Sequence, residues 1–218
     1  MKKIIFPQIP LENVKGVLID LDDTLYSFED ANLYALHKVH DRVQSVLPLS
    51  FDDFYRLYKQ QWTRLFADLG TVPSAHCRYT MFQRLMESQH IEKPYLWGQK
   101  LEKTYFKYLL KGIKPDPRAV AFLKSCKHRR IPVCLVTDLF AGIQVQKLNR
   151  LKLTRYIDYV VANDEVGIDK PHAGMFLHAL EKIKVAPKDA VMIGDNFEKD
   201  IQGAQALGIR AYQVTFDK

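Results

Sequence analysis

Short apolar runs and amphipathic stretches alternate along the C-terminal half of the chain. The apolar runs are typical of buried strands, whereas stretches with apolar positions three and four residues apart are typical of helices. The predicted helices are 116–128, 141–151, 173–183 and 197–207, and they alternate with predicted strands at 131–137, 157–162, 189–194 and 209–214. Repeated helix–strand units of this length predict a parallel sheet that helices cover on both faces.

The N-terminal half begins with one more predicted strand, residues 15–20, and then changes character. No further strand is expected before residue 112. Instead, four helices rich in aromatic residues are predicted at 29–47, 51–68, 74–90 and 94–111, and prolines and a glycine separate them. The aromatic residues of the second helix recur at three- and four-residue intervals, as in the packed core of a helical bundle.

These patterns together predict an α/β fold in which a Rossmann-like parallel sheet is interrupted after its first strand. We expect residues 1–25 and 112–218 to form the core, and residues 26–111 to form an inserted helical domain. A chain of 218 residues is long enough to bury a substantial core of this kind.

The composition adds a moderate positive charge to this picture. The chain has 32 Lys and Arg against 25 Asp and Glu, a net charge of +7, with 47% hydrophobic residues. This balance suits anionic small molecules. The densest basic cluster, residues 127–130, fits a solvated helix C-terminus, so we expect no specific nucleic-acid partner.

Three cysteines, Cys77, Cys126 and Cys134, form no C-x-x-C pair and no metal-ligand spacing. Such a sparse set is typical of a reducing compartment, and Cys134 is expected to be an inert core residue. The apolar segment at the N-terminus is too short for a signal peptide, and no run is long enough to span a membrane. We therefore expect a cytoplasmic protein without membrane contact, either a monomer or a homodimer.

The candidate chemistry begins at the end of the first long strand, where Asp20 and Asp22 lie two residues apart. Both carboxylates should leave the same side of the extended chain. Two converging carboxylates repel unless a cation lies between them, they share a proton, or one of them reacts. The carboxyl ends of parallel strands are also where such folds place their active sites. The structural alternative is an ordinary acidic turn.

The segment Asp20–Thr24 resembles motif I, D-x-D-x-T, of the haloacid dehalogenase superfamily. The strand ending at Thr137 resembles motif II, Lys170 before a proline resembles motif III, and Gly-Asp195 with a second aspartate, Asp200, resembles motif IV. The helical insertion has the position, length and character of the C1 cap found in one class of this superfamily. On these four motifs the chain is identified as a member.

The resemblance implies a Mg²⁺-dependent phosphatase that acts on a small phosphorylated metabolite through an aspartyl-phosphate. It assigns Asp20 as the nucleophile and Asp22 as the general acid and base. It places Mg²⁺ between Asp20, Asp195 and the backbone carbonyl of Asp22, which are oxygen ligands of the kind this cation prefers. Because Asp22 is present, phosphoryl transfer is favoured over dehalogenation.

The same resemblance makes Thr137 and Lys170 ligands of the phosphoryl oxygens and makes Asp200 a support for Lys170 or for the metal waters. Asp138 stands where many relatives have Asn; we assign it to the substrate-binding set, either pointing away from the phosphate or contacting the leaving group. Helix capping is the structural alternative for Thr137 and Asp200.

Two further functions stay open: a phosphomutase of the same family and a non-catalytic phosphometabolite-binding protein. The expected substrate is a nucleoside monophosphate or a sugar phosphate. Tyr26, Phe28, Tyr34 and Trp62 are candidates for stacking a nucleobase, although Trp62 fits core packing better.

Overall fold

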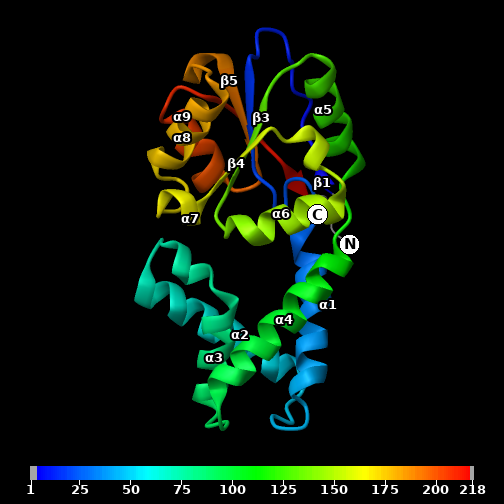
Figure 1. Cartoon of the computed structure of the whole chain (residues 1–218), viewed down its shortest axis with the longest axis vertical. Helices are drawn as coiled ribbons and strands as arrows, with labels where there is room; N and C mark the ends of the chain where they lie inside the picture. Colours follow the sequence, from blue (N-terminus) through cyan, green and yellow to red (C-terminus); the bar gives the residue numbers. More distant parts are fainter. Residues whose placement is uncertain (1–3, 217–218) are drawn as a thin grey trace. The chain divides into compact units, whose positions relative to one another are not determined.

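The computed structural model describes residues 4–216, and a five-stranded parallel sheet is its central feature (Figure 1). The order across the sheet is β4-β3-β2-β5-β6, and every neighbouring pair is parallel. The strands are β2 (Gly16–Ile19), β3 (Val133–Thr137), β4 (Tyr159–Ala162), β5 (Ala190–Gly194) and β6 (Arg210–Gln213). The predicted α/β fold is therefore confirmed.

Helices cover both faces of this sheet, with α8 and α5 on opposite sides (Figure 1). The helices that belong to it are α5 (Pro117–His128), α6 (Ala141–Leu151), α7 (Asn163–Val166), α8 (Ala173–Ile183) and α9 (Gly203–Gln205). Short 3-10 turns occur at Thr154–Tyr156 and Pro187–Asp189. The side chain of Asp116 begins α5 by accepting hydrogen bonds from the first backbone N–H groups, and Pro117 follows at the first helical position.

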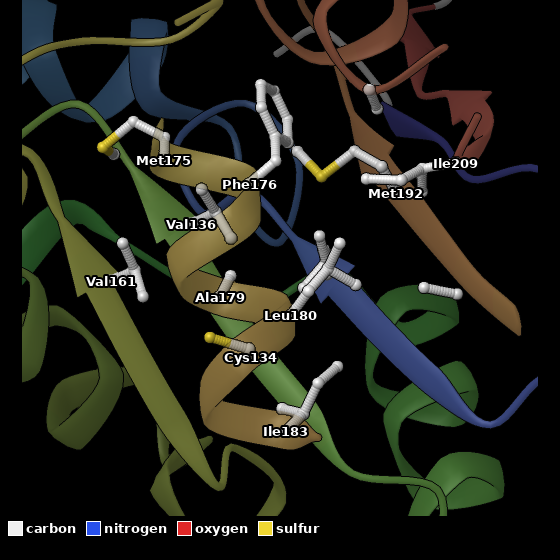
Figure 2. Packing of buried hydrophobic residues seen from close by; sticks show 13 residues of the cluster. Cys134, Val136, Val161, Met175, Phe176, Ala179, Leu180, Ile183, Met192 and Ile209 are labelled. Atoms are coloured by element: carbon white, nitrogen blue, oxygen red, sulfur yellow. The ribbon is translucent and has the colours of Figure 1, made fainter. Parts of the chain in front are cut away.

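A hydrophobic core lies between α8 and the sheet, as Figure 2 shows. Leu18, Cys134 and Met192 are opposite one another in the register of the three central strands, and all are buried. From α8, five residues on one helical face pack against them: Met175, Phe176, Ala179, Leu180 and Ile183. This is the spacing that a 3.6-residue repeat requires for one buried stripe. Burial raises the pKa of the Cys134 thiol to about 12, which confirms the prediction of an inert core cysteine.

The chain divides into two compact units, one with the residues through Phe28 and from Ile113 onward, and one with Glu29–Gly112. The second unit is helical. Its elements are α1 (Phe28–Val43), which begins at the end of the first unit, α2 (Phe51–Leu69), a 3-10 turn (Pro73–His76), α3 (Arg78–Ser88) and α4 (Pro94–Gly112). The expected helix 74–90 is thus wrong in its first part, because Cys77 is extended and separates the turn from α3.

Aromatic packing holds the second unit together. The Arg78 guanidinium lies 3.9 Å from the Trp62 ring centre and 5.1 Å from that of Tyr105. The face of the Trp62 ring thus packs against a cation, which favours a packing role for Trp62 over nucleobase binding. Tyr105 also donates a hydrogen bond of 2.7 Å to Asn32, which ties α4 to α1.

The two ends of the chain and the segment after β5 also differ from the sequence predictions. Ile4–Ile5 (β1) and Thr215–Phe216 (β7) form a small antiparallel ladder that the hydrophobic pattern does not predict. The expected helix 197–207 is instead a π-helical turn, Phe197–Gln202, followed by the short α9. No helix within residues 4–216 is long and apolar enough to cross a membrane.

Candidate active site

Three of the predicted site residues lie at the carboxyl ends of the three central strands. Asp20 follows β2, Thr137 is the last residue of β3, and Asp195 follows β5. Because β3, β2 and β5 are neighbours and parallel, their ends meet at one edge of the sheet. The backbone N–H of Asp20 donates to the carbonyl of Ile193 at 2.9 Å, so Asp20 is held in register with β5.

Lys170 is a buried cation of the site and comes from the loop between α7 and α8. Its Nζ donates to Asp20 Oδ1 at 2.8 Å, to Asp200 Oδ1 at 2.7 Å and to the carbonyl of Val136 at 3.0 Å. The side chains of Lys170, Asp20 and Asp200 are 3%, 9% and 1% exposed. Lys170 is therefore a buried counterion shared by two carboxylates.

The protonation tendencies of this cluster follow from burial and from charge. Burial lowers the pKa of Lys170, but the neighbouring carboxylates Asp20, Asp200 and Asp138 raise it more, so its pKa lies well above the usual value. Burial raises the pKa of Asp20 well above 3.8, and the nearby carboxylates add to this effect against the opposing influence of Lys170. Burial, with Asp200 and Asp23 nearby, raises the pKa of Asp195 to about 7. Burial and the neighbouring carboxylates thus oppose the ionisation of Asp20 and Asp195, although Lys170 favours it.

Asp200 approaches the backbone of β5 closely, and Gly194 permits this approach. A Cβ atom on Gly194 would lie 2.2 Å from Asp200 Oδ2 and 2.6 Å from Asp200 Cβ. From this position Asp200 Oδ2 accepts from the Asn196 N–H at 3.0 Å while Oδ1 holds Lys170. Asp200 belongs to the π-helical turn Phe197–Gln202 and contacts both Lys170 and the backbone that follows β5.

Three carboxylates form the set with metal-ligand potential. Oxygens of Asp20, Asp195 and Asp200 lie within 4.8 Å of one another. All are hard oxygen donors, and a bound cation would favour the ionised forms of Asp20 and Asp195, which burial and the neighbouring carboxylates disfavour. A divalent cation that prefers oxygen ligands fits this donor set. Asp200 already uses both oxygens, so Asp20 and Asp195 are the better ligands.

Asp22 lies in the loop after β2 and is surrounded by hydrogen-bond donors. Its oxygens accept from Lys147 Nζ at 2.8 and 2.7 Å, and the Tyr26 hydroxyl donates to Oδ1. Asp23 adopts a left-handed conformation with φ of 59° and accepts from the N–H of Phe28 at 2.8 Å. This turn, stabilised by Asp23, places Asp22 and Tyr26 side by side.

The structure changes the interpretation of two sequence predictions. Tyr26 is fully buried, so the prediction that it stacks a nucleobase is wrong; it binds Asp22 instead. Asp138 uses one carboxylate oxygen to accept from the Lys170 backbone N–H and the other to pair with Lys199, each at 2.8 Å. These contacts anchor the loop that carries Lys170, and substrate binding by Asp138 stays a prediction.

Two residues that contact the site are absent from the sequence predictions, Gln144 and Lys147 of α6. Both are fully buried. Gln144 Nε2 donates to Thr137 Oγ1 and, at 3.4 Å, to Asp22 Oδ2. The sequence did contain a signal for these two residues. Both occupy the buried face of α6, whose other positions are apolar: Ile143, Leu148 and Leu151. Polar residues within an apolar stripe are worth marking as candidates.

Comparison with known proteins identifies relatives of this chain. The model of the haloacid dehalogenase-like hydrolases matches residues 14–208. A ribulose-1,5-bisphosphate 5-phosphatase of Halopiger xanaduensis is 32% identical over 207 residues, which cover 93% of this chain and 84% of the relative. A glyceraldehyde 3-phosphate phosphatase of Methanothermobacter thermautotrophicus is 28% identical over 202 residues, 92% of this chain and 85% of the relative.

Among solved structures, the Bacillus subtilis protein YfnB, bound to magnesium, superposes with a TM-score of 0.72 at 23% identity. The match covers 91% of this chain and 87% of YfnB. At that level of identity the likeness shows the shared fold.

Proposed function

Since the chain belongs to the haloacid dehalogenase-like hydrolases and is a phosphoric monoester hydrolase, we propose that it is a Mg²⁺-dependent phosphatase of small sugar-type phosphates. The observation that carries this proposal is the shared ion pair. Lys170 binds both Asp20 and Asp200 at the edge of the sheet where Asp195 also lies. A buried cation among three carboxylates suits a site that must attract a phosphate dianion and still present a carboxylate nucleophile.

In the first step of this mechanism, a carboxylate oxygen of Asp20 attacks phosphorus. The new bond forms an aspartyl-phosphate while the bond from phosphorus to the alcohol oxygen breaks. Asp22, protonated before this step, gives its proton to the departing oxygen, so the alcohol leaves as a neutral molecule.

In the second step, a water molecule attacks the phosphorus of the aspartyl-phosphate. Asp22, now a carboxylate, takes a proton from the water as the bond between phosphorus and Asp20 breaks. Inorganic phosphate leaves, and both carboxyl groups return to their starting protonation states.

The remaining residues bind and orient the phosphoryl group. Thr137 and Lys170 are proposed to donate hydrogen bonds to its oxygens, and Asp200 holds Lys170 in place for that role. Asp20, Asp195 and the backbone carbonyl of Asp22 are the proposed Mg²⁺ ligands. The bound cation would neutralise part of the phosphoryl charge that otherwise repels Asp20.

The substrate class is inferred from the relatives. The two phosphatases reported above act on ribulose 1,5-bisphosphate and glyceraldehyde 3-phosphate, both phosphate esters of short polyhydroxy compounds. The loss of Tyr26 as a stacking residue removes one argument for a nucleotide substrate. A phosphorylated sugar or triose is therefore the favoured substrate.

The test is phosphate release from a panel that contains triose, pentose and pentulose phosphates, nucleoside monophosphates and phosphoserine. We expect release from the sugar-type esters with Mg²⁺ and none with excess chelator. Asp20→Asn should abolish turnover, whereas Asp41→Asn, at an exposed carboxylate paired with Lys38, should leave it unchanged. Near wild-type turnover by Asp20→Asn would show that the nucleophile is wrongly assigned.

Two other outcomes would point to the alternatives. Isomerisation of a sugar phosphate that begins only after addition of a sugar bisphosphate would indicate a phosphomutase. Tight binding of a phosphorylated compound with Mg²⁺, without turnover of any ester, would indicate a binding protein.

A further inference from the structure

Lys147 is a fully buried cation whose only role in the proposed mechanism so far is its contact with Asp22. Its Nζ reaches both Asp22 oxygens, at 2.8 and 2.7 Å, across 125 positions of sequence. The rings of Phe28 and Tyr26 lie 5.5 and 5.9 Å from the same Nζ. The ammonium therefore lies near two aromatic rings and contacts both oxygens of the Asp22 carboxylate.

Gln144, one helical turn before Lys147 on α6, connects the same carboxylate to Thr137. Its Nε2 donates to Thr137 Oγ1 and to Asp22 Oδ2. Because Thr137 accepts this hydrogen bond, its own hydroxyl hydrogen stays available for another acceptor, such as a phosphoryl oxygen. Gln144 thus links the predicted acid/base residue to a predicted phosphoryl ligand.

Stability alone does not account for these two residues. A buried ion pair is often no more stable than apolar residues of the same volume, because both charges must lose their hydration. The Oε1 atom of Gln144 is buried without a hydrogen-bond partner among residues 4–216, which costs about 1–3 kcal/mol. Polar groups kept at such a cost are typical of functional sites.

The exposure of the pair is also asymmetric. The side chain of Lys147 is 0% exposed, whereas that of Asp22 is 27% exposed. Asp22 is therefore held from behind and stays accessible in front. When Asp22 carries a proton on one oxygen, its other oxygen can still accept a hydrogen bond from Lys147.

We propose that Lys147 and Gln144 are positioning residues that hold Asp22 in place to protonate the leaving group. This inference rests on the proposed function, because it concerns the same reaction. The bond and proton changes are those of the first step: the phosphorus–oxygen bond breaks as the Asp22 proton moves to the departing oxygen. Lys147 and Gln144 neither gain nor lose a proton.

The leaving group provides a readout that a merely structural defect would not change. An alkoxide needs a proton as it departs, whereas p-nitrophenolate leaves without one. kcat/KM reports the steps through loss of the alcohol. In Lys147→Met we expect kcat/KM to fall about 100-fold for an alkyl phosphate, the scale of general acid catalysis, and less than about tenfold for p-nitrophenyl phosphate.

Lys182→Met is the matched control. Lys182 is on α8 and, like Lys147, pairs with a carboxylate, which in this case is Glu165. It should change neither rate. Asp22→Asn should show the same dependence on leaving group as Lys147→Met, and adding Lys147→Met to Asp22→Asn should cause no further loss. Gln144→Leu keeps a side chain of similar size. Its loss in kcat/KM should be smaller but should depend on the leaving group in the same way. This variant tests the proposal if Lys147→Met does not fold.

Equal losses in kcat/KM for both substrates in Lys147→Met and in Gln144→Leu would overturn the proposal. The proposal would also be overturned if the loss in the double variant with Asp22→Asn were the product of the two single losses. These outcomes differ from failure of the proposed function, which Asp20→Asn tests separately. If Asp20→Asn is inactive and the dependence on leaving group is absent, only the inference about Lys147 and Gln144 is lost.

Discussion

The close approach of Asp200 to Gly194 makes a single added methyl group a sharp test of the site. In Gly194→Ala, the new Cβ would lie 2.2 Å from Asp200 Oδ2, 2.3 Å from Asp200 Cγ and 2.6 Å from Asp200 Cβ. Relaxed contacts between carbon atoms require about 3.5 Å. Asp200 must therefore move by roughly 1 Å, since the strand that carries Gly194 is paired on both sides.

A movement of this size disrupts both hydrogen bonds of Asp200. Its 2.7 Å contact with Lys170 and its 3.0 Å contact with the Asn196 N–H lose their geometry. Overpacking costs about 1–3 kcal/mol, and a lost hydrogen bond to a charged group costs a similar amount. We expect a total of about 3 kcal/mol, which corresponds to a fall in melting temperature of roughly 6–12 °C for a chain of this length.

Activity should fall further than stability alone explains. Displaced Asp200 no longer orients Lys170, and a 1 Å displacement at a catalytic group costs about 100-fold in rate. The assays are thermal unfolding by circular dichroism and kcat/KM for the best substrate of the panel, measured well below the melting temperature.

Gly142→Ala is the matched control, because nothing lies within 4 Å of its added Cβ and it is exposed in the first turn of α6. It should leave activity unchanged and stabilise the helix by up to about 1 kcal/mol. If Gly194→Ala matched this control in both assays, the argument that Asp200 must occupy its present position would be refuted.

Three further predictions concern the charge cluster and the thiols. Mg²⁺ at about 100 times its dissociation constant should stabilise the wild-type fold by about 2.7 kcal/mol, seen as a higher melting temperature, and Asp195→Asn should largely remove this shift. Without metal, the pKa of Asp195 is about 7, above the value of 3.8 for the unfolded chain. The protonated carboxyl group therefore stabilises the fold below pH 4, and this contribution is lost as the pH rises through 7. Melting temperatures measured with chelator should fall over that range, and a flat profile would contradict the assignment. Burial raises the thiol pKa values of Cys126 and Cys134 to about 12, so at pH 8 a thiol reagent should label only Cys77 in the folded protein and all three cysteines after denaturation, as mass spectrometry would show.

Local patterns were sufficient for the fold class and for the strand ends. The apolar runs that end at Asp20, Thr137 and Asp195 mark the carboxyl ends of strands, and parallel strands bring those ends together. The resemblance to motif III of the family singled out Lys170, which the structure places in contact with Asp20 and Asp200. The catalytic roles of these residues stay predictions until the variants are measured.

Other features have no local signature. The ladder of β1 and β7 joins two-residue segments from opposite ends of the chain, too short for any hydrophobic period to appear. The π-helical turn Phe197–Gln202 has the composition of an ordinary helix, so its geometry has no signal in the local sequence. Burial of Tyr26 likewise depends on what packs over it.

The sequence by itself determined the parallel α/β fold with its helical insertion and the acidic strand ends, because these depend on residue spacing within single elements. Only the tertiary structure decided that Lys147 and Gln144 of α6 meet Asp22, and that Asp138 anchors the Lys170 loop. The physical reason is that hydrophobic spacing records which face of a helix is buried. It does not record which distant side chain that face will meet once the sheet has formed.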